Sequence, residues 1–257
     1  MTWVSLERVE IAAWADAVRA APAEVAEPAG IELLETGEAV ALAVRALPGS
    51  RMFNRAFGVA SEQELDRVAA FLAPRSSPYF VSTAPGAGLD GVLERRGYRR
   101  DYAWMKFRRG VEPLAAQSDL RVEQVGAEAG GTFGEIVAAV FGAPPFVAAW
   151  TAALPGRHGW ACFLAFAGGE PAGTAALFQH ERAGWLGFAA VLPEHRGRGG
   201  QQALLAARID RARRDGCGFL VTETGERVDG GASASYDNIL RGGFREAYSR
   251  PNWASPG

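Results

Sequence analysis

The order of apolar and polar positions after residue 118 predicts an alternation of strands and helices. Residues 119–125 have the pattern of a strand, and 131–142 and 146–154 have the apolar spacing of two helices. Between 159 and 180, two apolar runs flank Gly168-Gly169-Glu170-Pro171, which is typical of a hairpin between antiparallel strands. A third apolar run, an amphipathic helix, a strand, a short helix and a last strand complete the order βααβββαβαβ. The first four of these lie at 184–192, around 203–209, at 217–224 and at 234–241.

The first half of the chain repeats part of this pattern. Residues 93–102, LERRGYRRDY, align without a gap with residues 239–248, ILRGGFREAY. Upstream of both segments, residues 80–83 match residues 219–222. A strand-like stretch at 52–60 takes the place of the third apolar run. Two matches in the same order predict that the two halves are duplicated lobes of one fold.

A break in the periodic pattern separates the halves. Residues 111–120, VEPLAAQSDL, combine a proline with small polar residues, as a linker does. We therefore expect an amino-terminal lobe over residues 1–112 and a carboxy-terminal lobe over residues 118–257. Strands and helices that alternate in both lobes predict the α/β class.

Composition and charge narrow the classes of function. With 48% hydrophobic and 22% charged residues, the chain has the make-up of a folded globular protein. Its formal charge of −2 disfavours nucleic acid as a partner, because such binding depends on a basic surface. Cys162 and Cys217 stand far apart, without CxxC spacing or a nearby histidine cluster. We therefore expect two buried thiols, no disulfide framework and no metal site.

The sequence shows no signal for export and no membrane span. Residues 1–20 mix acids and arginines with apolar residues, whereas a signal peptide needs an unbroken apolar block. No apolar stretch approaches the roughly 18 residues that a spanning helix requires. We expect a cytoplasmic protein. Lys106 is the only lysine in a chain rich in Ala, Gly and Arg, which is typical of a GC-rich bacterial genome.

The most specific local feature is residues 189–209, where an apolar strand passes through a glycine-rich turn into a helix. Unpaired N–H groups at a helix start, together with the positive end of the helix dipole, stabilise an anion. Three glycines allow a close approach to the backbone, and two arginines add positive charge. These residues are Gly197, Gly199, Gly200, Arg196 and Arg198. The turn therefore suits a pyrophosphate; the alternative is a tight connection that binds nothing.

This turn resembles the signature of the GNAT acetyltransferase superfamily, V-x-P-x-x-R followed by [Q/R]-x-x-G-x-[G/A]. Val191-Leu192-Pro193-Glu194-His195-Arg196 supplies the first part, and residues 196–201 supply the second. Gln201 departs from the pattern, which has a small residue at that position. Downstream, Asn238 with Gly243-Phe244 is similar to the family's C-terminal N-x-x-x-x-G-F element. The likeness covers about residues 120–250.

The resemblance implies a fold and an acetyl-CoA site. It implies two GNAT-like lobes of α+β type, each a mixed, mostly antiparallel sheet flanked by helices, with the central strands of the carboxy-terminal lobe splayed apart. The pantetheine arm is expected along the strand that ends at Ala190, Val191 and Leu192, with Asn238 beside it. The pyrophosphate is expected at Arg196, Gly197, Arg198, Gly199, Gly200 and Gln201.

The chemistry that the resemblance implies is direct attack of an amine on a thioester. A lysine-like amine has a pKa of about 10.4, so a base or a water chain must take a proton, and another group must protonate the leaving thiolate. Glu223, at a strand end beside the splay, is the candidate base; the alternative is a solvated carboxylate. Ile239 stands near the position where many members of the family have a tyrosine that acts as the general acid. Tyr236, one helical turn earlier, is the candidate acid, with a packing or surface role as the alternative.

The amino-terminal lobe has no such turn. Its helix follows Ser61, a suitable cap, and carries Glu62, Glu64 and Asp66 in its first turns. These negative side chains would repel a pyrophosphate. We therefore expect a degenerate GNAT-like lobe without a cofactor site, in a tandem arrangement that binds one CoA per chain.

The function that the sequence predicts is acetyl-CoA-dependent N-acetyl transfer to an amine of a small molecule or peptide. The alternative is a non-catalytic acyl-CoA-binding module with a regulatory or scaffolding role, because the usual tyrosine is missing. Residues 141–150, FGAPPFVAAW, fit an acceptor with an apolar portion and fit core packing equally well. The sequence is compatible with a homodimer.

Overall fold

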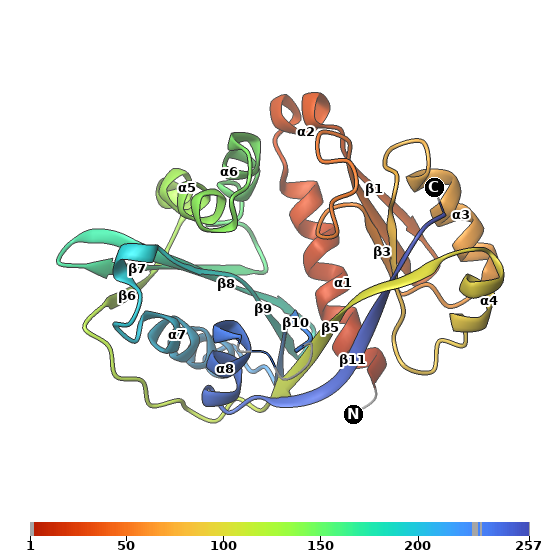
Figure 1. The fold of residues 1–257 in the computed structure, drawn as a ribbon. Coiled ribbons are helices and arrows are strands. Elements are labelled where there is room, and N and C mark those ends of the chain that lie inside the picture. Colours follow the sequence, from red (N-terminus) through yellow and green to blue (C-terminus); the bar gives the residue numbers. More distant parts are fainter. Residues whose placement is uncertain (1–2, 228–230, 232, 257) are drawn as a thin grey trace.

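The computed structural model describes residues 3–227, 231 and 233–256, which form two lobes on one continuous sheet (Figure 1). Eleven strands build the sheet in the described part of the chain, in the order β1-β2-β3-β4-β11-β5-β10-β9-β8-β7-β6. The first half contains α1 (Trp3–Ala20), α2 (Ala23–Ala29), β1 (Ile31–Thr36), β2 (Ala39–Val44), β3 (Arg55–Phe57), α3 (Glu62–Leu72), β4 (Phe80–Ser82), α4 (Asp90–Arg95) and β5 (Arg99–Arg109). The second half contains β6 (Arg121–Val125), α5 (Gly130–Phe141), α6 (Pro145–Thr151), β7 (Trp160–Ala167), β8 (Glu170–His180), β9 (Ala183–Val191), α7 (Gly200–Arg214), β10 (Phe219–Gly225), α8 (Ala234–Arg241) and β11 (Arg245–Ala254).

Both lobes repeat one arrangement of strands and helices. Neighbouring strands are antiparallel except for one pair in each lobe, β3 with β4 and β9 with β10. Helix α3 connects the first parallel pair, and α7 connects the second. Gly97 after α4 and Gly243 after α8 have φ angles of 79° and 77°, so the same turn leads into β5 and into β11. The repeat predicted from the sequence is therefore present in the fold.

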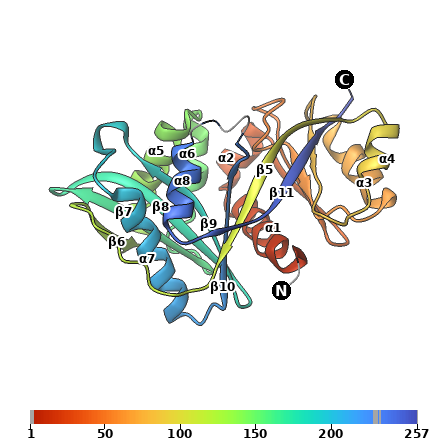
Figure 2. The same ribbon diagram turned by 60° about the horizontal axis from the view of Figure 1, so that its bottom comes forward.

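The last strands of the two halves are exchanged. Strand β5 lies between β10 and β11, and β11 reaches back to pair with β4 (Figure 2). The two exchanged strands pair antiparallel, with Arg99 opposite Ala254 and Arg108 opposite Arg245. The two-lobed, mostly antiparallel architecture is confirmed, and the exchange joins what would be two sheets into one.

Most elements of the second half lie where the sequence predicts them. Helix α8 spans Ala234–Arg241, as predicted, and the hairpin between β7 and β8 turns at Gly168-Gly169. Both glycines have positive φ, 59° and 107°, which explains why glycine is needed twice in succession.

The strand predicted over residues 52–60 is much shorter in the structure. Strand β3 covers only Arg55–Phe57. Before it, the Asn54 side chain accepts a hydrogen bond from Val44 N–H at 2.9 Å and donates one to the Leu47 carbonyl at 2.6 Å, which fixes a loop. The prediction was wrong at this point because side-chain bonds, rather than apolar periodicity, set the start of the strand.

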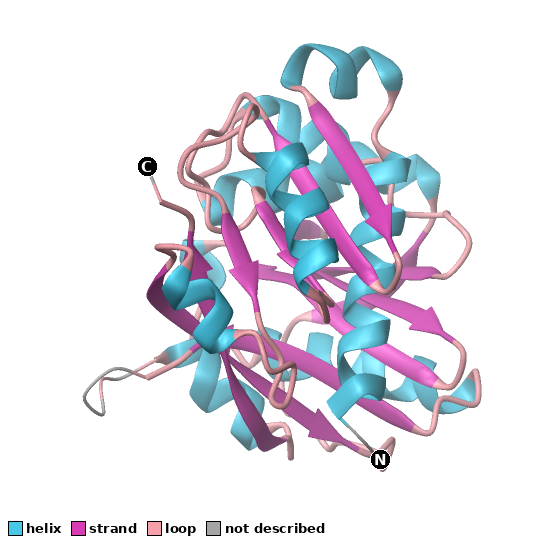
Figure 3. Cartoon of the chain, turned by 90° about the vertical axis from the view of Figure 1, so that its right-hand side faces the viewer, coloured by secondary structure: helices cyan, strands magenta, loops and turns pink. Residues whose placement is uncertain are grey.

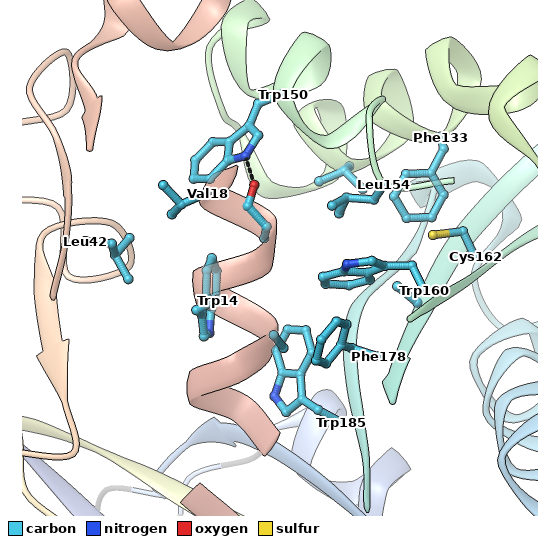
Figure 4. Packing of buried hydrophobic residues seen from close by; sticks show 14 of the residues in the cluster. Trp14, Val18, Leu42, Phe133, Trp150, Leu154, Trp160, Cys162, Phe178 and Trp185 are labelled. Atoms are coloured by element: carbon cyan, nitrogen blue, oxygen red, sulfur yellow. Dashed lines mark hydrogen bonds between the residues drawn. The ribbon is translucent and has the colours of Figure 1, made fainter. Parts of the chain in front are cut away.

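Helices cover both faces of the sheet (Figure 3). On one face, side chains of α1, α5 and α6 share a core with β7 to β10; on the other, α7 and α8 share a second core with alternate residues of the same strands. Trp14, Trp150, Trp160 and Trp185 gather in the first core (Figure 4). Trp150 donates to the Ala17 carbonyl at 2.6 Å, so core packing accounts for this end of the 141–150 segment.

Candidate functional site

Helix α7 begins without a side-chain cap. Its N-cap is Gly199, and both Gly197 and Gly199 adopt left-handed φ angles, 77° and 76°. Ala203 N–H bonds to the Gly199 carbonyl and starts the helical ladder. The N–H groups of the helix residues before Ala203 therefore have no acceptor within the helix, and they point out of its start. This is the anion-binding geometry that the sequence predicted for the turn.

The irregular segment 110–120 packs beneath this turn. A Cβ on Gly199 would lie 2.1 Å from the Gln117 carbonyl oxygen, so the two backbones nearly touch. Ser118 Oγ donates to the Arg198 carbonyl at 2.8 Å, and Arg198 binds the Asp119 carboxylate at 2.6 and 2.8 Å. The hydrogen bond from Arg198 lowers the pKa of Asp119. Sequence reasoning missed Asp119, because no motif joins it to a residue 79 positions away.

The two arginines of the turn differ in their bonding. Arg198 is paired with Asp119, whereas Arg196 is exposed and its Nε donates to the Val191 carbonyl at 3.2 Å. Arg196 therefore supplies the less compensated positive charge beside the start of α7. Gln201, which departs from the family pattern, is half-buried in the first turn of the helix.

The central strands of the carboxy-terminal lobe separate as predicted. Strands β9 and β10 pair only at residues 183–185 and 219–221, although β9 continues to Val191. A register shift against β8 places an extra residue in β9 between Gly187 and Ala190. Phe188, in this bulge, has a φ of 50°, a conformation that costs a bulky residue energy and that clusters at functional sites.

In the described part of the chain, one backbone edge at the end of β9 has no neighbouring strand. Leu192 N–H donates to the Ala172 carbonyl at 2.9 Å, toward β8. Because successive residues of a strand point their backbone groups to opposite edges, Ala190 also faces β8, while Val191 N–H faces the gap that β10 leaves. Of the three residues predicted to line the pantetheine, Val191 is placed best to offer a main-chain donor.

Helix α8 lies beside the start of α7. Gln202 Nε2 donates to the Asn238 carbonyl at 2.8 Å, and the Asn238 side chain accepts from Arg241 at 2.5 Å. Asn238 thus lies beside the first turn of α7, and the contact with the pantetheine that the resemblance implies stays a prediction. The role of Gln202 as the link between the helices was not foreseen.

Glu223 is buried, so it is not the solvated carboxylate that the sequence left open as the alternative to a base. Its side chain is only 9% exposed, Lys106 Nζ lies 2.9 Å from Oε2, and Trp185 Nε1 lies 3.1 Å from both carboxylate oxygens. Burial raises the pKa of Glu223 and the nearby Glu10 carboxylate raises it further, while Lys106 opposes the rise. A carboxyl whose pKa is moved toward neutrality has the property required of a general base.

Tyr236 and Glu223 lie on opposite faces of the sheet. Glu223 pairs with Lys106 across β10 and β5, whereas Tyr236 packs edge-on against Phe107, the next residue of β5, at 4.8 Å. The Tyr236 hydroxyl donates a short hydrogen bond to Glu246. Burial and this bond raise the pKa of Tyr236 to about 12. Glu246 was not foreseen from the sequence.

The helix of the amino-terminal lobe that corresponds to α7 is closed by its own side chains. Ser61, the N-cap of α3, accepts from Glu64 N–H at 3.2 Å, and Glu64 accepts in return from Ala60 N–H at 2.8 Å. This variant of the capping box, in which Glu64 bonds Ala60 rather than Ser61, occupies the Glu64 N–H, a donor of the kind that the start of α7 leaves open. The cap predicted at Ser61 is confirmed.

Other kinds of site are not evident in the part of the chain that the structure describes. Cys162 and Cys217 are buried and unpaired, and no group of three or more His, Cys, Asp or Glu side chains is arranged to hold a metal ion there. None of the described helices is long and apolar enough to cross a membrane. An open hollow of about 520 Å³ lies in the amino-terminal lobe, lined by residues such as Arg51, Phe80 and Asp101, and it does not include the start of α7.

Comparison with known proteins agrees with this geometry. Residues 137–236 match the model of the Acetyltransferase (GNAT) family. No curated protein matches the chain. A GCN5-related N-acetyltransferase from Kribbella flavida is 17% identical with a TM-score of 0.62, covering 94% of this chain and 96% of that one. A GCN5-related N-acetyltransferase from Sphaerobacter thermophilus is 18% identical with a TM-score of 0.61, covering 87% and 83%.

A protein described as tandem is also similar in fold. A tandem GNAT protein from the clavulanic acid biosynthesis pathway is 17% identical with a TM-score of 0.59, and the match covers 99% of this chain and 94% of that one. Sequence identities this low show only that the folds are similar. The similarity in fold extends over both lobes. Residues 137–236 therefore match the GNAT acetyltransferase family model, and the two lobes together have the fold of a tandem GNAT protein.

Proposed function

We propose that this protein transfers an acetyl group from acetyl-CoA to the amine of a small molecule or peptide, with residues 118–257 as the catalytic domain. The match of residues 137–236 to the GNAT family model supports acyl transfer in general. The observation that carries the narrower proposal is the uncapped start of α7, which follows directly from the point where β9 has left β10. A helix start with free N–H groups and a gap between strands adjoin there, as a bound nucleotide thioester would require.

The residues around this gap fit a nucleotide thioester. The free N–H groups of the first turn of α7, with the exposed Arg196, would hold the pyrophosphate. Val191 N–H, on the open edge of β9, would pair with the pantetheine arm. Asn238 would border the arm from α8, since Gln202 ties that helix to the start of α7.

In this proposal the general base, Glu223, and the general acid, Tyr236, act from opposite faces of the sheet. The bound thioester supplies an activated acetyl carbonyl. Glu223 takes a proton from the acceptor amine, whose nitrogen bonds to the carbonyl carbon as the C–S bond breaks. Backbone N–H groups at the β9 bulge stabilise the negative carbonyl oxygen. On the other face, Tyr236 gives up its hydrogen bond to Glu246 and passes a proton to the departing sulfur.

The amino-terminal lobe, residues 1–112, binds no CoA in this proposal. Its equivalent helix start is occupied by the Ser61–Glu64 capping box, and Glu62 adds a further negative charge in the first turn. An anion would have to displace that box and approach like charge. We therefore expect calorimetric titration with CoA to give one equivalent per chain, and two equivalents would contradict the assignment.

Thiol release from acetyl-CoA across a panel of amines tests the activity itself. Arg196→Gln should weaken CoA binding by about tenfold to a hundredfold, because a charge-assisted hydrogen bond contributes about 1.5–3 kcal/mol. Arg213→Gln, at the far end of the same helix, is the matched control and should leave the affinity within about twofold. Absence of CoA binding at millimolar ligand would reject the site. Binding without transfer to any amine would favour the non-catalytic acyl-CoA-binding module instead.

A further inference from the structure

Lys106 stands between two carboxylates that come from different lobes. It is fully buried, and its Nζ lies 2.9 Å from Oε2 of Glu223 and 2.5 Å from Oε2 of Glu10. Lys106 on β5 and Glu10 on α1 belong to the amino-terminal lobe, whereas Glu223 belongs to the carboxy-terminal lobe. The exchange of β5 is what brings Lys106 opposite Glu223 in the sheet. The candidate base is therefore held by a residue of the lobe that lacks the CoA turn.

The remaining charges around Glu223 act on it less directly. Arg250 binds Glu10 through both terminal nitrogens, at 2.5 and 2.9 Å, and Arg55 Nη2 lies 3.9 Å from Glu10. Among the described side chains, Lys106 is the cation that forms an ion pair with Glu223. The ionisable groups packed around the pair are Glu7 and Glu10 on α1, Arg55 on β3, and Tyr248 and Arg250 on β11.

We propose that Lys106 and Glu10 are positioning residues for Glu223, so that the amino-terminal lobe completes the catalytic site of the other lobe. Lys106 orients the Glu223 carboxylate together with the Trp185 indole and favours its charged form. Glu10 competes for the same ammonium group and disfavours that form. This inference rests on the proposed function, in which Glu223 is the general base.

The two residues should shift the ionisation of Glu223 in opposite directions. A base works when it is deprotonated, so the acid limb of the kcat/KM profile reports the pKa of Glu223 in the free enzyme. Lys106→Gln removes a positive charge from the carboxylate and should move the limb to higher pH. Glu10→Gln removes a negative charge and should move it to lower pH. Charges at these distances shift a pKa by about 1–3 units, so each displacement should reach about one unit.

A role confined to stability would not produce this pattern. Both substitutions leave a buried charge uncompensated, and both should therefore lower the melting temperature. Only a positioning role gives limbs displaced in opposite directions. Lys106→Arg, which keeps the charge, should restore at least half of the displacement seen with Lys106→Gln. Asp16→Asn is the matched control: it breaks an ion pair between α1 and Arg157 that does not touch Glu223, and it should leave the limb in place.

Carbon NMR offers a test that does not depend on turnover. Because Lys106 is the only lysine, protein labelled with 13C-lysine gives a single Cε resonance in a carbon NMR spectrum. That resonance should show a transition when the unmodified protein is titrated with acid, and Glu223→Gln should abolish the transition.

The outcomes separate this inference from the function on which it rests. Limbs that stay in place, or that move in the same direction in both variants, would overturn the positioning role while leaving the enzyme assignment intact. A lysine resonance that does not change as Glu223 titrates would also overturn the positioning role. If no amine is acetylated, the proposed function fails, and the lysine resonance still decides whether Lys106 senses Glu223.

Discussion

The contact between the linker, residues 111–120, and the turn at 196–201 can be tested with two glycines that have nearly the same φ angle but different surroundings. Gly197 and Gly199 have φ angles of 77° and 76°. A Cβ on Gly197 would meet nothing within 4 Å, whereas a Cβ on Gly199 would lie 2.1 Å from the Gln117 carbonyl and 3.2 Å from Ser118 Cα. Substitution of each by alanine therefore separates backbone strain from contact with the linker.

The expected magnitudes follow from these surroundings. Forcing an alanine into the left-handed region costs about 1–2 kcal/mol at either position. The smaller unfolded-state entropy of alanine returns about 0.4–1 kcal/mol in both cases. At Gly199 the clash is with backbone atoms, which cannot rotate away, and overpacking of this kind costs a further 1–3 kcal/mol or so. Gly199→Ala should therefore be less stable than Gly197→Ala by about 1–3 kcal/mol.

Equilibrium unfolding in guanidinium chloride measures the difference, with the m-value compared to confirm that the denatured states are alike. The same two proteins should be titrated with CoA. Gly199→Ala should bind more weakly, since relief of the clash must displace either the turn or the segment that carries Ser118 and Asp119. Equal stabilities for the two variants would refute the packing of the linker beneath the turn.

Three further predictions follow from the core and the exchanged strands. Trp150→Ala should destabilise the protein by about 3–5 kcal/mol in urea unfolding, because it empties a buried site between α6 and α1. Tyr236→Phe should lower kcat about tenfold or more with unchanged CoA affinity, and an unaltered kcat would remove the residue from the mechanism. Residues 118–257 expressed alone lack β5 and should show no cooperative thermal transition, whereas a sharp transition would contradict the dependence on strand exchange.

The glycine-rich turn at 196–201 and the helix that follows it could be predicted from the sequence because their requirements are local. Left-handed glycines, neighbouring arginines and an abrupt helix start must occur within a few residues, and a linear pattern records them. The repeat was visible for a similar reason, since a helix, a glycine turn and a strand form one short unit around Gly97 and around Gly243. Both features can be recognised in the sequence because each depends on residues that are close together in the chain.

The exchange of strands and the surroundings of Glu223 could not be predicted in this way. A duplicated sequence is the same whether each last strand stays in its own lobe or crosses to the other. Glu10, Lys106 and Glu223 come from α1, β5 and β10, and no spacing relates them. The single lysine was informative only about composition until the fold placed it between two carboxylates. The sequence indicated Glu223 as a candidate base only through its position beside the splay, and it did not predict that the side chain is buried.

Stability alone does not explain why charged side chains fill the junction of the lobes. Three bases, Arg55, Lys106 and Arg250, face three acids, Glu7, Glu10 and Glu223, so the charges balance. Loss of one member should cost about 3–5 kcal/mol, yet replacing such a network by well-packed apolar residues is often neutral or stabilising. An apolar junction would therefore hold the lobes together as well. A junction that must also set the pKa of one carboxyl has a use for charges of both signs, because burial raises the pKa of Glu223, Glu10 raises it further and Lys106 lowers it. The network provides both at the edge of the splay.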